Sequence, residues 1–283
     1  MTNSAAESVR RKYWTDYMNR MDALIDELLD YPCEECGERL GSIPEAIDAA
    51  GVEAMYSDSL ICDEFERIFV IRENLLPDLV TIASDMNERG WILKFEDGFR
   101  TEEMQTRLGR SREAFDRVVR SCVWESDLQR PPADLVFKRA RVMIANYGRG
   151  GTHMQGSAVD ISVFNRQDGS EIWRGCPYLE MSELTPMDCP FVSEEDHANR
   201  LAITEVMERN HFTHFPGEFW HYNQGDALDQ ILRKTARPGR FGPVHWDPVT
   251  HRVTPYEDPL QPLNSFEDVE AEIDVALARL ATG

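Results

Sequence analysis

Long apolar stretches are missing from this sequence of 283 residues, and this absence limits where the protein can act. No run of about 18 apolar residues occurs, which excludes a membrane-spanning helix. The first residues, MTNSAAESVRRKYW, do not contain the apolar segment of a secretory signal peptide. We therefore expect a cytoplasmic protein.

Positive charge is also scarce. The chain has 30 Lys and Arg residues against 51 Asp and Glu, for a formal net charge of −21. Nucleic acids and anionic membrane surfaces are bound through clustered Lys and Arg, so we expect neither as a partner. The simplest role of this negative net charge is to keep the protein soluble.

Cysteine offers little that points to a function. The six cysteines, in a chain without an export signal, are expected to be reduced thiols rather than disulfides. Cys33 and Cys36 form a single CxxC motif. A structural zinc site needs four ligands, and no second CxxC is present. A redox role would require a thioredoxin-like βαβ setting, which the pattern around the pair does not predict. Neither function is assigned to the pair.

Apolar residues make up 42% of the chain, enough for a sizeable core. Helical spacing of apolar residues predicts helices over residues 5–30, 64–89, 102–120, 194–210 and 265–281. Alternating and β-branched residues predict strands over 91–99 and 158–164, a hairpin turn at Asp168-Gly169 with a returning strand at EIW, and short strands within 211–223.

Helices mixed with short strands, without βαβ alternation, predict an α+β fold. We expect a small antiparallel sheet flanked by helices, with an additional mainly helical N-terminal segment. The expected divisions are an N-terminal extension over residues 1–60, a catalytic domain over 61–250 and a C-terminal tail with a helix over 251–283.

Two of the seven histidines have neighbours that suggest a metal site. His153 lies in GGTHMQGSAVDIS, before the predicted strand that carries Asp160, and His221 lies in GEFWHYN, three residues after Glu218. A catalytic zinc needs three protein ligands and an open position, and a nearby carboxylate acts as the base. In an extended segment Glu218 and His221 would face opposite sides, so the Pro-Gly turn just before them must redirect the chain. On spacing alone, these residues form a plausible metal site but not a specific one.

Three segments in order carry a more specific signal. THMQGSAVD resembles the His-x-x-Gly-x-Ala-x-Asp signature of the D-alanyl-D-alanine dipeptidase and carboxypeptidase family of zinc peptidases, and GEFWH resembles that family's Glu-x-Trp-His signature. EDGFR, upstream, resembles the Asp-Gly-Tyr-Arg segment of the dipeptidase branch, which includes the vancomycin-resistance dipeptidase. The resemblance covers about residues 65–225.

The resemblance implies a role for each matching residue. His153, Asp160 and His221 would bind one zinc ion per chain. Glu218 would be the general base that takes a proton from the attacking water. Arg100 would stabilise the peptide carbonyl or the developing oxyanion.

The substrate-binding residues that the resemblance implies match the family less closely. The family has Ser where this chain has Gly151, so the neighbouring Thr152 is the candidate for its hydrogen bond. Asp188 would receive the free amino group of the substrate, although the segment before it contains two extra residues. Tyr56 would contact the substrate or be a core tyrosine. Asp97 would orient Arg100, or cap its own Asp-Gly turn.

The resemblance therefore implies a zinc metallopeptidase that hydrolyses a short D-amino-acid dipeptide such as D-Ala-D-Ala, a component of peptidoglycan metabolism in the cell wall. Two alternatives stay open: a D,D- or L,D-carboxypeptidase or other amide hydrolase of this family, and a non-catalytic zinc-containing module that binds a peptide. Segments at the start and at the end of the sequence lie outside the resemblance. They would cover the active-site cleft or form a homo-oligomer contact.

Overall fold

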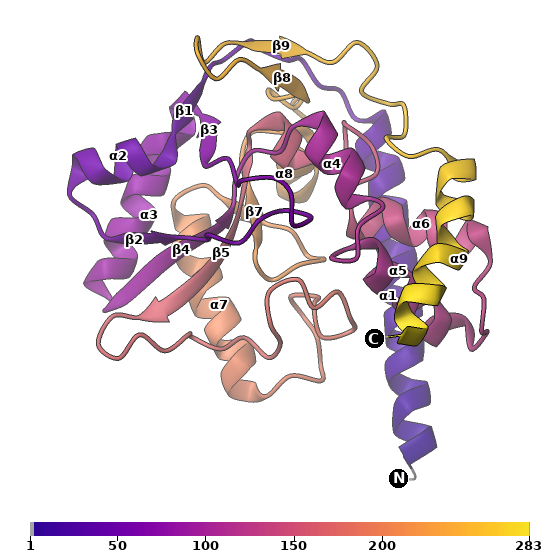
Figure 1. Ribbon diagram of the computed structural model, residues 1–283. Helices are drawn as coiled ribbons and strands as arrows, with labels where there is room; N and C mark the ends of the chain where they lie inside the picture. Colours follow the sequence, from indigo (N-terminus) through magenta and orange to yellow (C-terminus); the bar gives the residue numbers. More distant parts are fainter. Residues whose placement is uncertain (1–2, 283) are drawn as a thin grey trace.

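The computed structural model describes residues 3–282 and confirms an α+β fold (Figure 1). The helices are α1 (Asn3–Asp30), α2 (Ile43–Ala50), α3 (Leu76–Glu88), α4 (Glu102–Leu108), α5 (Phe115–Ser126), α6 (Ala133–Met143), α7 (Glu194–Arg209), α8 (Ala227–Arg233) and α9 (Phe266–Thr282), with 3₁₀ turns η1 (Glu73–Leu75) and η2 (Thr152–Gln155). The strands are β1 (Leu40–Ser42), β2 (Ala54–Tyr56), β3 (Val70–Arg72), β4 (Trp91–Asp97), β5 (Ala158–Asn165), β6 (Thr213–His214), β7 (His221–Asn223), β8 (Val244–Trp246) and β9 (Val253–Pro255).

The central sheet has five strands in the order β2-β4-β5-β7-β6. Every neighbouring pair is antiparallel except β2 and β4, which are parallel. The prediction of an antiparallel sheet therefore holds for β4, β5, β7 and β6. It is corrected at one edge, where β2 pairs in parallel with β4 and is connected to it through β3 and α3.

One face of this sheet packs on helices. Alternate residues of β5, namely Val159, Ile161 and Val163, join a buried cluster with side chains of α2, α3 and α7. Because side chains alternate between the faces of a strand, Ala158, Asp160 and Ser162 belong to the opposite face. That second face carries the candidate site.

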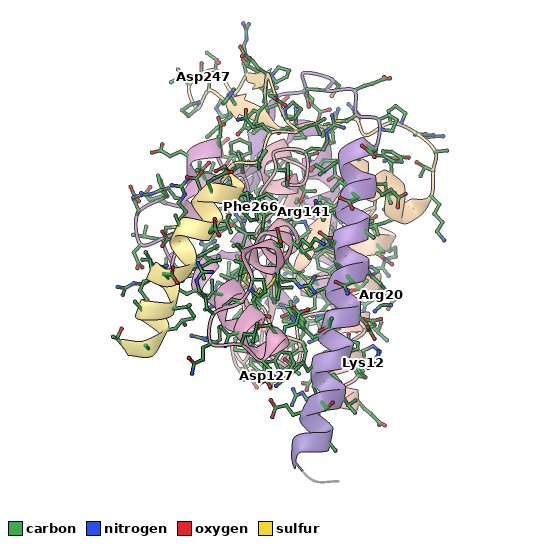
Figure 2. The ribbon with its side chains drawn as sticks, turned by 90° about the vertical axis from the view of Figure 1, so that its right-hand side faces the viewer. Lys12, Arg20, Asp127, Arg141, Asp247 and Phe266 are labelled. Atoms are coloured by element: carbon green, nitrogen blue, oxygen red, sulfur yellow. The ribbon has the colours of Figure 1, made fainter. Side chains whose placement is uncertain are left out.

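A second apolar cluster unites helices from distant parts of the chain. The buried side chains of α1 recur at helical spacing and form one stripe: Trp14, Tyr17, Met18, Met21, Ile25 and Leu28. They share a core with α5, α6 and α9. Figure 2 shows α9 and α1 on either side of α6. The first and last helices thus pack on the same part of the molecule.

Several expected elements differ from the structure. The helix expected over 64–89 is shorter, because Val70–Arg72 forms β3 and η1 precedes α3. Pro77 lies in the first turn of α3, where its missing N–H removes no helical hydrogen bond. The helix expected over 102–120 is two helices, α4 and α5, separated by a turn after Gly109. The returning strand expected at EIW is only a single bridge between Phe164 and Glu171.

The helices expected over 5–30, 194–210 and 265–281 and the strands expected over 91–99 and 158–164 are confirmed to within a few residues. Helices α2, α6 and α8 were not predicted from the sequence. Within residues 3–282, no helix is both long and apolar enough to span a bilayer.

Candidate metal centre

Sheet register brings two of the predicted ligands together. Asp160 in β5 pairs directly with His221 in β7. Tyr222 belongs to the core on the helix-covered face, so alternation directs His221 to the other face, together with Asp160. The turn expected before β7 is present, and the His221 N–H donates to the Glu218 carbonyl oxygen at 3.2 Å. The turn therefore keeps Glu218 close to the ligand that follows it.

A 3₁₀ turn carries the third predicted ligand. His153 lies in η2, which ends at Gly156 with φ of 64°. A Cβ on Gly156 would lie 2.5 Å from Leu40 Cδ2, so both the left-handed backbone and the close packing favour glycine. This turn connects directly to β5 and holds His153 against the start of the strand that carries Asp160.

The ligand atoms of His153, Asp160 and His221 all lie within 4.8 Å of one another, and the three residues are buried. Asp160 Oδ1 lies 3.2 Å from His153 Nε2 and 2.9 Å from His221 Nδ1. Tetrahedral zinc with bonds of about 2.0–2.1 Å separates its ligand atoms by roughly 3.3 Å. The spacing of these three donors therefore fits a zinc ion.

The remaining nitrogen of each ring also has a partner. His153 Nδ1 lies 2.6 Å from the Gly98 carbonyl oxygen, and His221 Nε2 lies 2.8 Å from Thr152 Oγ1. Metal-binding imidazoles commonly donate their second N–H in this way, which fixes the tautomer that binds the ion. With these second nitrogens protonated, each ring would offer its other nitrogen, on the Asp160 side, to a metal ion.

The protonation states also suit a metal site. Burial alone would raise the pKa of Asp160, but His153 and His221 hold that pKa well below its ordinary value. Burial lowers the pKa of His221, and Asp160 only partly offsets the effect. An ionised carboxylate and a neutral imidazole are the forms that bind a metal.

A β-bulge brings Asp97 to the same face as Asp160. The register of β4 shifts between Phe95 and Asp97, so that Asp97 pairs with Asp160. Without the shift, Asp97 would share the core face with Phe95, two residues earlier. The buried carboxylate of Asp97 accepts from Arg100 Nε at 2.7 Å and lies 3.2 Å from an Arg67 nitrogen.

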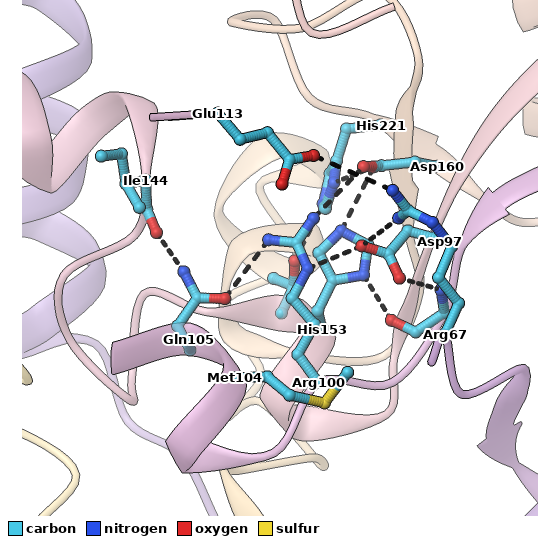
Figure 3. A network of polar contacts seen from close by, with 12 residues as sticks. Arg67, Asp97, Arg100, Met104, Gln105, Glu113, Ile144, His153, Asp160 and His221 are labelled. Carbon is cyan, nitrogen blue, oxygen red and sulfur yellow. Dashed lines mark hydrogen bonds and ion pairs between the residues drawn. The ribbon is translucent and has the colours of Figure 1, made fainter. Parts of the chain in front are cut away.

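Arg100 is held on several sides (Figure 3). Its Nη1 donates to Gln105 Oε1 at 3.2 Å, and its Nη2 lies 3.6 Å from Asp160 Oδ2. Burial alone would lower the pKa of Arg100, but the negative charges of Asp97 and Asp160 outweigh burial and raise it. The guanidinium is therefore a fixed, permanent cation beside the ligand cluster.

Three members of this network were not predicted from the sequence. Tyr178 donates to Asp160 Oδ2 at 2.8 Å, Gln105 contacts Arg100, and Arg67 contacts Asp97. Tyr178 comes from the irregular segment between β5 and α7, where no spacing rule applies. Burial and the charge of Asp160 raise the pKa of Tyr178, so its hydroxyl stays a donor to the carboxylate.

The cluster opens into a cavity of about 70 Å³. Its polar lining includes Arg100, Glu218 and the three metal-ligand candidates, while most other lining side chains are apolar. Glu218 is partly buried. Burial and the charge of Asp160 raise the pKa of Glu218 to about 8, against an opposing effect of Arg100. A carboxyl group with this pKa both accepts and releases a proton near neutral pH.

The other predicted substrate residues occupy different places. Thr152 lines the cavity, but its hydroxyl contacts His221, so it orients a ligand. Asp188 is exposed and does not line the cavity; the Tyr13 hydroxyl lies 3.4 Å from its carboxylate. Tyr56 stacks on Phe95 and also does not line the cavity. We therefore do not assign Asp188 or Tyr56 a contact with a molecule bound there.

Replacing Thr152 with Val is expected to lower the affinity for zinc about 10- to 100-fold, because His221 loses the partner that fixes its tautomer. Competition with a chromophoric chelator measures this affinity. Thr204→Val is the matched control, since it removes a buried hydroxyl that contacts Tyr222, away from the site. Equal zinc affinity in Thr152→Val and the unmodified protein would contradict the assigned role.

One of two comparisons with known proteins matches the part of the chain that contains the candidate metal ligands. A search among curated proteins gives no match. Residues 117–237 match the D-Ala-D-Ala dipeptidase family. The matched region is less than half of the chain and contains His153, Asp160, Glu218 and His221, whereas Arg100 precedes it. Over residues 117–237, the chain is thus similar in sequence to a peptidase family, and the similar region holds the whole candidate ligand set.

Proposed function

We propose that the protein is a zinc-dependent peptidase that hydrolyses a short D-amino-acid dipeptide such as D-Ala-D-Ala. The observation that carries the proposal is that one small cavity is lined by a His-Asp-His cluster with zinc-like spacing, a carboxyl group and a fixed guanidinium. The similarity of residues 117–237 to the D-Ala-D-Ala dipeptidase family supports the same reaction class.

Each residue contributes a separate part of the chemistry. Bound zinc supplies a Lewis acid and makes water easier to deprotonate. Glu218 accepts a proton from the attacking water and later passes it to the leaving amine, a transfer that suits its raised pKa. Arg100 donates hydrogen bonds to the carbonyl oxygen as negative charge develops on it. Asp97 and Gln105 hold Arg100 in place, so little reorganisation is needed during the reaction.

The walls of the cavity favour a short substrate. Ile25 and Leu28 of α1 line it on one side, together with residues 141–145 at the end of α6. Tyr17, also on α1, donates to the Pro216 carbonyl oxygen just before Glu218. Helix α1 therefore lies across the site and leaves little space for a polymer. D-Ala-D-Ala, a cytoplasmic precursor of peptidoglycan, fits this restriction better than a cell-wall peptide.

A substrate panel with metal analysis of the same sample tests the proposal. We expect about one zinc per chain, hydrolysis of D-Ala-D-Ala, and little hydrolysis of L-Ala-L-Ala or of a muropeptide that ends in D-Ala-D-Ala. Preferred cleavage of the muropeptide would instead indicate a carboxypeptidase. Bound zinc without turnover of any peptide would indicate a binding module and would overturn the proposal.

A further inference from the structure

A second arginine, Arg141, lines the same cavity as Arg100. It lies in the last turn of α6, beside α1 (Figure 2). The guanidinium of Arg100 already contacts Asp97, Gln105 and the carboxylate of Asp160. Arg141 contacts none of these groups, so its charge is not needed to build the metal centre.

The polar contacts of Arg141 all involve one nitrogen. Its Nη2 lies 2.6 Å from Asp26 Oδ1, 3.0 Å from Asp22 Oδ1 and 3.3 Å from the Asp22 carbonyl oxygen, all in α1. The Nε atom is buried and has no hydrogen-bond partner. Among the described residues that line the cavity, Arg141 is the one with a buried side-chain donor left without a partner.

This pattern is not what a purely structural ion pair requires. A buried charged donor without a partner costs free energy. Other described arginines, among them Arg139 and Arg174, also have a buried nitrogen without a partner, but Arg141 is the one that lines the cavity. An arginine that only joined α6 to α1 would be fully served by a carboxylate that bridged two of its nitrogens. Here two carboxylates share Nη2 while Nε stays unpaired, which leaves hydrogen-bonding capacity for a further acceptor.

The surroundings define what that acceptor is. Asp22 and Asp26 of α1 hold Nη2, whereas most side chains that line the cavity with Arg141 are apolar, including Ile25, Leu28 and Val142. The carboxylates among the described lining residues are Asp160 and Glu218, which the metal centre and the proton transfer already use. A guanidinium with spare donors favours a planar anion, and a carboxylate matches its geometry.

We propose that Arg141 binds the C-terminal carboxylate of the substrate. The inference rests on the proposed function, because it places the end of the peptide in the cavity that contains the reacting centre. It makes Arg141 a specificity determinant: a chain must end within this cavity to satisfy the guanidinium. A peptide that continued past this point would have no carboxylate to offer to Arg141.

Binding to a zinc-loaded Glu218→Gln variant tests the proposal, because this variant is expected to hold ligand without consuming it. Calorimetry compares D-Ala-D-Ala with its C-terminal amide, which differs only in the group that Arg141 recognises. We expect the free acid to bind at least about tenfold more tightly than the amide, as for a charge-assisted hydrogen bond. Adding Arg141→Gln should remove this preference, and Arg141→Lys should keep part of it.

Two controls separate recognition from structure. Asp26→Asn removes one ion pair of the same guanidinium but keeps the cation and its contact with Asp22, so the preference for the free acid should remain. Arg130→Gln is the matched control for the arginine-to-glutamine change, because it removes an exposed ion pair with Asp274 outside the cavity. If Arg141 only joined α6 to α1, then Arg141→Gln and Asp26→Asn would lower Tm alike and neither would change the acid-to-amide ratio.

The outcomes also separate this inference from the proposed function. Acid-selective binding that depends on Arg141, without turnover of any peptide, would support the inference while the proposed function fails. Turnover of D-Ala-D-Ala with equal binding of acid and amide would overturn the inference and leave the proposed function standing. The inference would also be overturned if neither the free acid nor the amide bound.

Discussion

Replacing Glu218 with Gln is expected to lower the hydrolysis rate at least about 100-fold while zinc stays bound, given the usual contribution of a general base. The amide keeps the size of the side chain but cannot accept the proton of the attacking water. The three ligand candidates are unchanged, so the metal content should match that of the unmodified protein. Steady-state kinetics and metal analysis of one sample measure both properties.

The matched control is Glu208→Gln. Glu208 lies in α7, pairs with His214 and does not line the cavity, so its loss should leave the rate essentially unchanged. Full activity in Glu218→Gln would show that another group removes the proton, and loss of zinc from this variant would show that Glu218 supports the metal centre instead.

The raised pKa of Glu218 adds a second readout on the same variant. With a pKa of about 8, Glu218 carries a proton at pH 7 in the metal-free protein. A cation bound nearby favours the carboxylate, so zinc binding should expel that proton. At pH 7 the unmodified protein should release up to about one more proton than Glu218→Gln, and the difference should vanish near pH 9, where Glu218 is already ionised. Calorimetry in buffers of different ionisation enthalpy measures this release.

The metal cluster shows what local sequence can predict. The β-branched run around Asp160 predicts a strand, and the turn before His221 is required if Glu218 is to lie close to it. Both features are local, because strand propensity and turn chemistry depend on neighbours in the sequence. The pairing of Asp160 with His221 is a register between distant strands, and only the resemblance to a family pointed to it.

The residues around the cluster show where local sequence is insufficient. Asp97 reaches the site through a bulge, and Tyr178 reaches it from an irregular segment, so neither follows a periodic pattern. The resemblance suggested Asp188 as a partner of the substrate, but its side chain is exposed and does not line the cavity. The position of α1 across the cavity depends on packing with α6, which no pattern within either helix specifies.

Replacing Arg100 with Lys is expected to lower kcat about 100- to 1,000-fold, as for removal of a donor to a developing oxyanion. The guanidinium uses its Nε for Asp97 and its Nη1 for Gln105, which fixes the direction of the donors that remain. An ammonium group keeps the charge, but its donors lie on one nitrogen and do not reproduce the planar fork that reaches Asp97 and Gln105 and also donates toward the carbonyl. KM should change much less than kcat, because the interaction strengthens only as the oxyanion forms.

Arg67→Lys is the comparison that tests whether geometry matters more than charge. Arg67 lies 3.2 Å from the same Asp97 carboxylate but does not line the cavity. It therefore supports Arg100 without reaching the substrate, and its replacement should cause a smaller loss in kcat. An equal loss of kcat in both variants would show that activity depends on the ion-pair network as a whole. It would then give no support for a direct role of Arg100 at the carbonyl. If Arg100→Lys kept its kcat, charge alone would suffice and the fixed guanidinium would be unnecessary.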